Sequence, residues 1–359
     1  MVFLRAVLIF LLSTAAQAAD NLHPPAGFMQ PPAHSVTAAP TVKCLTVPAP
    51  FTGTLDFHSK YEGSDSARAT LNPEADAAFR QQTKPITEME SVVSKQVTAW
   101  ARSGDPRYVA CAVGALNTWA TAGALTGEAA NHTGKSMRKW ALASFSSAWL
   151  QLAFSPAKPL TAYPAEQKAI TTWLSQLGDL TAAEWRDLPL KQVNNHSYWA
   201  AWALMATAVA TQRQDLFDQS LAIYRTAMQQ VDAGGLLPNE LRRRQRAFSY
   251  HNYAIQPLVM IALFARANGI NVIDENHGAL QRLGDTLLAS LDDDSRYTQH
   301  TGVAQERNFL QQPTNLAWLE GWCQLYPCSA AVEQRLAPLR PLRNTRLGGD
   351  ITHLLAVAP

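Results

Sequence analysis

The sequence predicts an all-α fold assembled from antiparallel pairs of helices. Helix-forming stretches follow one another through most of the chain, sustained two-residue alternation is missing, and the Val/Ile clusters typical of strands are few. Short polar connections join the stretches and no linker divides them. The 359 residues therefore fit a single large domain of stacked helical hairpins.

Residues 1–18 have the pattern of a cleaved secretory signal. An apolar run from Ala6 to Leu12 follows Arg5, and Ala16-Gln17-Ala18 has the small-x-small form of a signal-peptidase site. No later apolar stretch reaches the about 20 residues that a membrane-spanning helix needs. We therefore expect residues 19–359 to form an exported domain that does not span a membrane.

The bulk charge of the chain is close to neutral. The formal net charge is +2, and removal of the single charge of Arg5 with the signal leaves +1. So small an excess gives no general attraction to nucleic acid or to membrane surfaces. A site for an acidic ligand must come from a local group of basic residues.

Four cysteines in an exported chain favour disulfide bonds over free thiols. Three pairings are possible in principle, and the short spacing of Cys323 and Cys328 favours one loop there, which leaves Cys44 to pair with Cys111. The sequence has no Cys-x-x-Cys and no His-Glu-x-x-His motif. We expect no metal site and no cofactor.

The segment before the helices is rich in proline and alanine between residues 20 and 55, which predicts an extended arm over residues 19–58. Turn-forming residues from Ser59 to Arg68 predict a loop. Asn72-Pro73 then predicts a capped helix that runs toward Ala101. Further helices are predicted at about 107–125, 136–153, 164–177, 196–211, 214–230, 249–267, 277–291, 314–326 and 330–338.

The stretch from Asn131 to Trp140 contains Gly134-Lys135-Ser136, which is similar to a phosphate loop only in those three residues. The upstream glycine and the preceding strand of such a loop are missing, so we expect no nucleotide site. Thr133 or Ser136 is the predicted cap of a helix here. The basic residues that follow could hold an acidic ligand or could be a solvated helix face.

The stretch from Asn194 to Trp199 combines two amides, an imidazole and two aromatic rings at the start of a strongly apolar helix. Asn194 or Asn195 is the predicted cap. The positive end of the helix dipole disfavours a charged His196, so we expect a neutral ring. A satisfied core histidine is the alternative, and the density of polar groups favours a functional site.

The stretch from Pro238 to Tyr253 holds four arginines within five positions. If it is helical, Arg243, Tyr250 and either Arg246 or Ala247 project to one side. Guanidinium groups beside a tyrosine favour its phenolate, which predicts an acid/base role for Tyr250. The alternative is an arginine-rich surface over a core tyrosine.

Together these stretches, with Ser59 to Asp65 and Arg346 to Asp350, resemble the alginate lyases of polysaccharide lyase family 5, the periplasmic poly(β-D-mannuronate) lyases. The resemblance covers almost all of the chain after the signal. It implies an α/α toroid, an incomplete barrel of helical hairpins with a long cleft. It also implies β-elimination on alginate, a periplasmic location and the alginate export machinery as a partner.

The resemblance assigns roles to named residues. Asn195, His196 and Arg243 would surround the substrate carboxylate, where donors stabilise the charge of the enediolate. Tyr250 would take the C5 proton and then protonate the leaving O4.

The residues that would hold neighbouring sugars are Ser59, Lys60, His132 and Thr133, with Lys60 as a lid residue. Tyr198 and Trp199 would stack on sugar rings, with core packing as the alternative for Trp199.

Two other functions remain open from the sequence. A glycoside hydrolase on the same toroid needs two carboxylates beside the cleft, for which Glu128, Asp232 and Glu240 are candidates. A non-catalytic protein that binds polyuronates would need only the basic cleft and would not require Tyr250.

Overall fold

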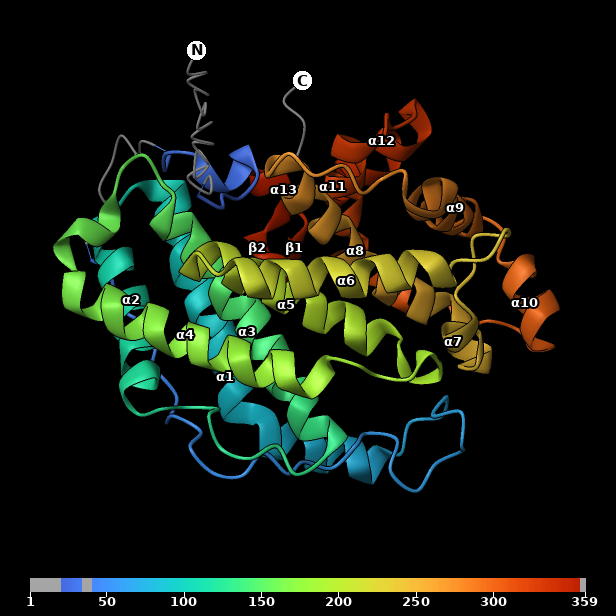
Figure 1. The fold of residues 1–359 in the computed structure, drawn as a ribbon, viewed down its shortest axis with the longest axis horizontal. Coiled ribbons are helices and arrows are strands. Elements are labelled where there is room, and N and C mark those ends of the chain that lie inside the picture. The colour runs from blue at the N-terminus through green and yellow to red at the C-terminus, as the bar shows by residue number, and fades with distance from the viewer. Residues whose placement is uncertain (1–20, 34–40, 356–359) are drawn as a thin grey trace, which may run out of the picture.

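The computed structural model describes residues 21–33 and 41–355, and the predicted signal lies outside them. The described chain is mostly helical (Figure 1). Its helices are α1 (Pro73–Ser103), α2 (Pro106–Thr121), α3 (His132–Ala153), α4 (Pro164–Trp185), α5 (Asn195–Thr211), α6 (Gln214–Gln230), α7 (Pro238–Leu241), α8 (Ala247–Ala267), α9 (Glu275–Ser290), α10 (Ser295–Thr301), α11 (Trp318–Leu325), α12 (Ala330–Leu336) and α13 (Ile351–Leu355). Two short antiparallel strands, β1 (Arg343–Asn344) and β2 (Gly349–Asp350), pair near the C-terminal end.

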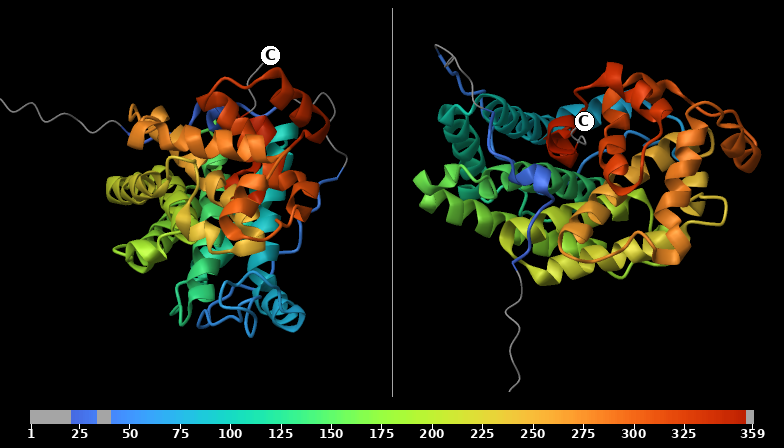
Figure 2. Two further views of the ribbon diagram at one scale, coloured as in Figure 1. Left: turned by 90° about the vertical axis from the view of Figure 1, so that its right-hand side faces the viewer. Right: turned by 90° about the horizontal axis from the view of Figure 1, so that it is seen from above.

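The long helices form two concentric series. One series packs in the order α1, α3, α5, α8 and α11, and the other in the order α2, α4, α6 and α9. Members of the two series alternate along the chain and also contact one another. Figure 2 shows the resulting curved arrangement from above. The fold is therefore all-α, an α/α toroid, and the predicted fold class is confirmed.

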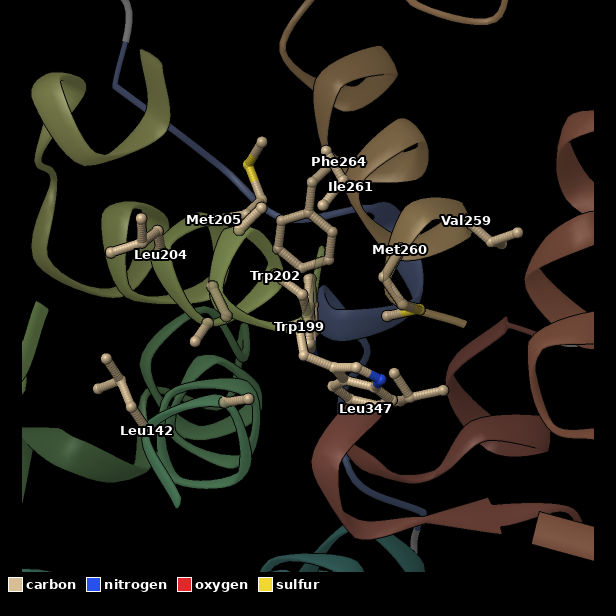
Figure 3. Packing of buried hydrophobic residues seen from close by; sticks show 14 of the residues in the cluster. Leu142, Trp199, Trp202, Leu204, Met205, Val259, Met260, Ile261, Phe264 and Leu347 are labelled. Atoms are coloured by element: carbon tan, nitrogen blue, oxygen red, sulfur yellow. The ribbon is translucent and has the colours of Figure 1, made fainter. Parts of the chain in front are cut away.

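The central helix of the inner series is α5. It packs against α3, α4, α6 and α8, and its residues from Ser197 to Val209 are all buried. A helix that is apolar on every side can only be stable inside a protein, which explains the run of alanine, leucine and tryptophan. Trp202 sits 5.0 Å from Phe264 of α8, ring centre to ring centre (Figure 3).

The helix starts come from identifiable caps. Asn194 precedes α5 and its side chain accepts a hydrogen bond from the His196 N–H, which confirms the predicted cap. At α3 the prediction was wrong, because Asn131 is the cap and accepts from the Gly134 N–H. The helix consequently begins at His132 and carries both His132 and Thr133 in its first turn.

The segment between α7 and α8 is not a continuous helix. A short 3-10 turn occupies Arg244–Arg246, and Arg244 has a left-handed backbone with φ of 50°. The assumption that the arginine-rich stretch from Pro238 to Tyr253 is one continuous helix was therefore wrong. The helices α7, α10 and α13 were not predicted, because so few turns give no recognisable apolar period.

The N-terminal arm is tied to the helical body. Cys44 forms a disulfide with Cys111 of α2, and Leu55 makes an isolated β-bridge with Ala129 just before α3. A second disulfide joins Cys323 to Cys328 at the end of α11. Both predicted disulfides are confirmed. Within the described ranges, no helix has the length and apolar character required to cross a membrane.

One buried histidine in α8 has both ring nitrogens close to backbone groups. His251 is fully buried, its Nε2 accepts a hydrogen bond from the Leu237 N–H at 2.8 Å, and its Nδ1 lies 2.8 Å from the Ala247 carbonyl oxygen. Burial lowers the pKa of His251 to about 4. Protonation would place an N–H against another N–H, so the folded state binds this proton more weakly than the unfolded chain does.

We therefore expect stability to fall as the pH drops from about 6.5 to 4. Because the folded pKa lies below the unfolded one, His251 contributes its full stabilisation above the unfolded value and loses it toward pH 4, by up to about 3 kcal/mol. Denaturant unfolding of His251→Gln across this range should show a shallower pH dependence than the parent protein. Equal slopes would contradict the assignment.

Candidate active site

A cleft of about 360 Å³ opens where the N-terminal ends of α3, α5 and α8 meet the loop 59–68. Inner helices run in one direction, because an outer helix separates each from the next, so their starts reach the same rim. The positive ends of their dipoles converge there. Ser59, Lys60, His132 and Thr133 line this cleft, as do Asn195, His196, Arg243 and Tyr250.

The cleft is cationic. Lys60, Arg68, Arg243, Arg246 and Arg346 line it, whereas no aspartate or glutamate of the described chain does. Such a lining attracts an acidic polymer. It also argues against the glycoside hydrolase, which needs two carboxylates in the cleft.

The carboxylates proposed for a hydrolase lie elsewhere. Glu128 and Asp232 are exposed away from the cleft, and Glu240 is buried behind Asn195. The basic residues after Thr133 had been expected to hold an acidic ligand or to form a solvated helix face. Arg138 does neither, because it is buried and pairs with Glu184.

The Tyr250 hydroxyl lies between a guanidinium group, which can stabilise its phenolate form, and a second tyrosine hydroxyl, which can exchange a proton with it. Its oxygen is 2.7 Å from the Tyr61 hydroxyl and 2.6 Å from Nη2 of Arg243. The Arg243 guanidinium also lies 4.0 Å from the centre of the Tyr250 ring. Arg246 donates to the Tyr61 hydroxyl at 3.1 Å. The contact between Arg243 and Tyr250 was predicted, although the backbone between them takes a different path.

The two tyrosines differ in acidity. Burial raises the pKa of Tyr250 well above its usual value, and this outweighs the lowering by Arg243. The expectation that the neighbouring guanidinium groups favour its phenolate was therefore wrong for the net pKa, although Arg243 acts in the expected direction. Although burial opposes it, the pKa of Tyr61 is lowered by Lys60, by its hydrogen bond to Tyr250 and by Arg246 and Arg243. The two hydroxyls are joined by a short hydrogen bond, along which Tyr250 can pass its proton to an ionised Tyr61 and so become a base itself.

His196 lies in the first turn of α5, surrounded by aromatic rings. The rings of His132, Trp140 and Trp185 lie 4.5, 5.7 and 6.1 Å from it, centre to centre. Burial lowers the pKa of His196 well below its usual value, and nearby Lys139 and His132 add to the effect. The ring is neutral as predicted, but desolvation and neighbouring positive charge are the main causes.

Asn195 is held from behind by Glu240. The backbone N–H of Asn195 donates to Oε1 of Glu240 at 2.6 Å, and its Nδ2 donates to Oε2 at 2.9 Å. Burial raises the pKa of Glu240 to about 7. An ionised Glu240 accepts from the amide NH₂, whereas a protonated one can donate to the amide oxygen. Here Nδ2 faces Glu240, and Oδ1 is buried without a hydrogen-bond partner among the described residues, so the orientation of the Asn195 amide depends on the Glu240 proton.

Comparison with known proteins identifies the family. Residues 56–297 match the family model described as alginate lyase. The chain belongs to the alginate lyases of polysaccharide lyase family 5. It is 50% identical over 341 residues to the alginate lyase of Pseudomonas syringae pv. syringae, and this match covers 95% of this chain and 90% of that protein. The alginate lyase of Cobetia marina is 47% identical over 342 residues, covering 95% and 91%.

Solved structures support the fold of this alginate lyase. A histidine-to-alanine variant of alginate lyase A1-III, complexed with a tetrasaccharide, superposes with a TM-score of 0.75 at 21% identity, covering 90% of this chain and 89% of that one. The crystal structure of alginate lyase A1-III from Sphingomonas species A1 superposes with a TM-score of 0.72 at 22% identity, covering 88% of this chain and 86% of that one. An alginate lyase from Bacteroides ovatus superposes with a TM-score of 0.59 at 19% identity, covering 80% of this chain and 78% of that one.

Two aromatic residues expected to stack on sugars belong to the core of this alginate lyase. Trp199 is 1% exposed and lies among the buried hydrophobic residues (Figure 3). It donates from Nε1 to the Tyr253 carbonyl and stacks on the Tyr253 ring. Tyr198 is fully buried and its hydroxyl donates to Gln230. The stacking prediction was wrong for both, and the alternative of core packing is confirmed for Trp199.

Several cleft residues were missed by the sequence reasoning. Tyr61 lay within a quoted stretch but received no role, although it contacts Tyr250 directly. Trp140 and Arg346 also line the cleft, and the Arg346 guanidinium lies 4.5 Å from the Trp140 ring centre. Trp140 stands in the stretch from Asn131 to Trp140 and Arg346 in the stretch from Arg346 to Asp350, and this was the only sign of them in the sequence. Only the fold shows that the two residues meet.

Proposed function

We propose that this alginate lyase cleaves 1→4-linked β-D-mannuronate by β-elimination, with Tyr250 as the group that moves protons. The observation that carries the proposal is the Tyr250 hydroxyl, which lies in a cationic cleft between Tyr61 and Arg243. No carboxylate of the described chain competes for the acid/base role there.

The proposed reaction has two proton transfers. Tyr250 as phenolate removes the C5 proton, and the electron pair of the C–H bond moves toward the carboxylate to give an enediolate. The C4–O4 bond then breaks as the C4=C5 double bond forms. Tyr250, now a phenol, returns the proton to O4 of the leaving sugar. No redox cofactor is required, because neither oxidation nor reduction occurs.

The neighbours of Tyr250 lower the barrier. A C–H beside a carboxylate becomes acidic only if the developing negative charge is stabilised by fixed donors. Arg243 supplies a guanidinium and His196 supplies a neutral N–H, while Asn195 supplies its amide. Ser59, Lys60, His132 and Thr133 hold the adjoining uronates, and Lys60 on the loop closes over the bound chain.

We predict a preference for mannuronate blocks over guluronate blocks. In mannuronate the C5 proton and O4 lie on the same side of the ring, so one tyrosine reaches both, whereas in guluronate they lie on opposite sides. Initial rates on the two purified block polymers, followed by the ultraviolet absorbance of the unsaturated product, test this. Equal rates would contradict a single-tyrosine mechanism, and no absorbing product from either polymer would favour the non-catalytic binder.

We further propose that the protein acts in the periplasm and clears alginate there during its production and export. The signal pattern of residues 1–18 and the two disulfides favour an oxidising compartment. Cell fractionation with mass analysis of the N-terminus tests this, with a start near Ala19 expected. An intact Met1 in the exported fraction would contradict it.

A further inference from the structure

Behind His196 lies a buried lysine to which no role has been given so far. Lys139 of α3 is fully buried, and its Nζ lies 3.0 Å from Nδ1 of His196 and 3.2 Å from Oγ of Ser136. Ser136 Oγ is itself 3.1 Å from the same Nδ1. The cleft side of the ring is different, because Nε2 of His196 bonds no group in the part of the chain that the structure describes, and His196 lines the cleft.

Aromatic rings, and not a carboxylate in a salt bridge, surround the amino group of Lys139. Its Nζ lies 3.8 Å from the centre of one Trp185 ring and 4.9 Å from Trp140. The nearby Glu184 carboxylate is already paired with Arg138. Aromatic faces attract an ammonium group. Among the described residues, the hydrogen bonds of Nζ therefore go to Ser136 and His196 alone.

We propose that Lys139 is a positioning residue whose ε-amino group donates to Nδ1 of His196 and so keeps the ring proton on Nε2, facing the substrate carboxylate. This rests on the role proposed above for His196. An ammonium group has three donors and no acceptor, so Nδ1 must accept. The Ser136 oxygen accepts from Nζ, which turns its own hydrogen toward Nδ1, so its donation to the ring also depends on Lys139.

The consequence concerns the charge that develops during the reaction. With the proton on Nε2, the imidazole presents an N–H to the carboxylate as it becomes an enediolate. With the proton on Nδ1, the Nε2 lone pair would face that negative charge and raise the barrier.

The charge of Lys139 is under opposing influences. Burial and Arg346 lower its pKa well below the usual value, whereas Glu184 raises it. The aromatic rings also favour the ammonium form. A neutral amine keeps two N–H groups with which to donate to Nδ1 but also has a lone pair that could accept from an Nδ1–H, so a measurement of the tautomer is the direct test of the direction of this hydrogen bond.

The first test is a direct measurement of the tautomer. Long-range ¹H–¹⁵N NMR of the ¹⁵N-histidine-labelled protein at pH 7, with His196 assigned by the missing signals in His196→Gln, should show a proton on Nε2 and none on Nδ1. A proton on Nδ1, alone or together with one on Nε2, overturns the proposal. This outcome does not depend on the reaction, so it is separable from a failure of the proposed function.

The second test removes the amine. Lys139→Met keeps the length of the side chain, and we expect kcat to fall roughly 100-fold with KM little changed and with Nδ1 protonation appearing in the spectrum. Lys135→Met removes one charge a turn earlier on the same helix without contact to His196, and should keep kcat within about twofold. An unchanged kcat and an unchanged His196 spectrum in Lys139→Met overturn the proposal.

A chemical rescue separates positioning from packing. Lys139→Cys is unfolded with its disulfides intact, alkylated with either 2-bromoethylamine or 1-iodopropane, and refolded. The aminoethyl product restores the amine and should recover most of the lost kcat and the Nε2 tautomer, whereas the propyl product should not. Equal kcat values for the two products overturn the proposal, and the spectrum of the unaltered protein decides the matter if neither refolds.

Discussion

Tyr250→Phe is expected to lower kcat by several powers of ten while polymer binding and thermal stability stay near those of the parent protein. The substitution keeps the ring and removes the one hydroxyl that takes the C5 proton and returns it to O4. The lost atom also bonds Tyr61 and Arg243, both of which keep a further partner, because Arg246 donates to Tyr61 and Arg243 donates to the Arg68 carbonyl oxygen. Initial rates on polymannuronate and equilibrium binding of the polymer measure both quantities.

Tyr61→Phe is the matched control, because it removes the other hydroxyl of the same hydrogen bond. Tyr250 then keeps its contact with Arg243 and can still reach the substrate, so a smaller loss is expected. Its pH–rate profile should shift to higher pH, since the group that accepts the shared proton is gone. If Tyr250→Phe kept a tenth or more of the parent kcat, or if Tyr61→Phe lost more, Tyr250 would not be the base.

The parts of the molecule that follow from local rules could be predicted from the sequence. The cap at Asn194, the apolar run of α5 and the two disulfides depend on residues close together in sequence or on cysteine pairing. The site residues on the helix starts were found because they stand in distinctive stretches. Their meeting in one cleft came from the family resemblance, since no spacing rule joins α3, α5 and α8.

The features that depend on burial could not be predicted in the same way. Trp199 looks like a sugar-stacking residue because it follows His196 closely, yet its place on α5 turns it toward Tyr253 and the core. The pKa of Tyr250 was misjudged for the same reason, because a sequence shows the neighbouring arginines and not the desolvation that outweighs them. Glu240 and Lys139 act from behind the cleft, at positions that only the packing of α3, α5 and α7 defines.

His196→Ala is expected to lower kcat about 10²- to 10³-fold, because it removes one fixed donor to the developing enediolate. His196 is neutral, since burial and Lys139 hold its pKa well below the usual value, so its loss removes an N–H and not a full charge. Binding of the acidic polymer should therefore weaken only slightly. By contrast, Arg243→Ala should weaken binding and turnover together, because a guanidinium is lost from the cleft. Initial rates and polymer affinity of the two variants separate these effects.

His196→Gln distinguishes a donor from a base. The glutamine side chain offers an N–H at a similar reach but cannot take a proton near neutral pH, so a donor role predicts a smaller loss of kcat than in His196→Ala. Equal losses in the two variants would indicate that His196 itself accepts the C5 proton. Trp199→Phe serves as the control for packing beside the site, because Trp199 is buried against Tyr253 and absent from the cleft lining. It should lower the melting temperature and leave KM unchanged, so a changed KM would mean that the ring reaches the substrate after all.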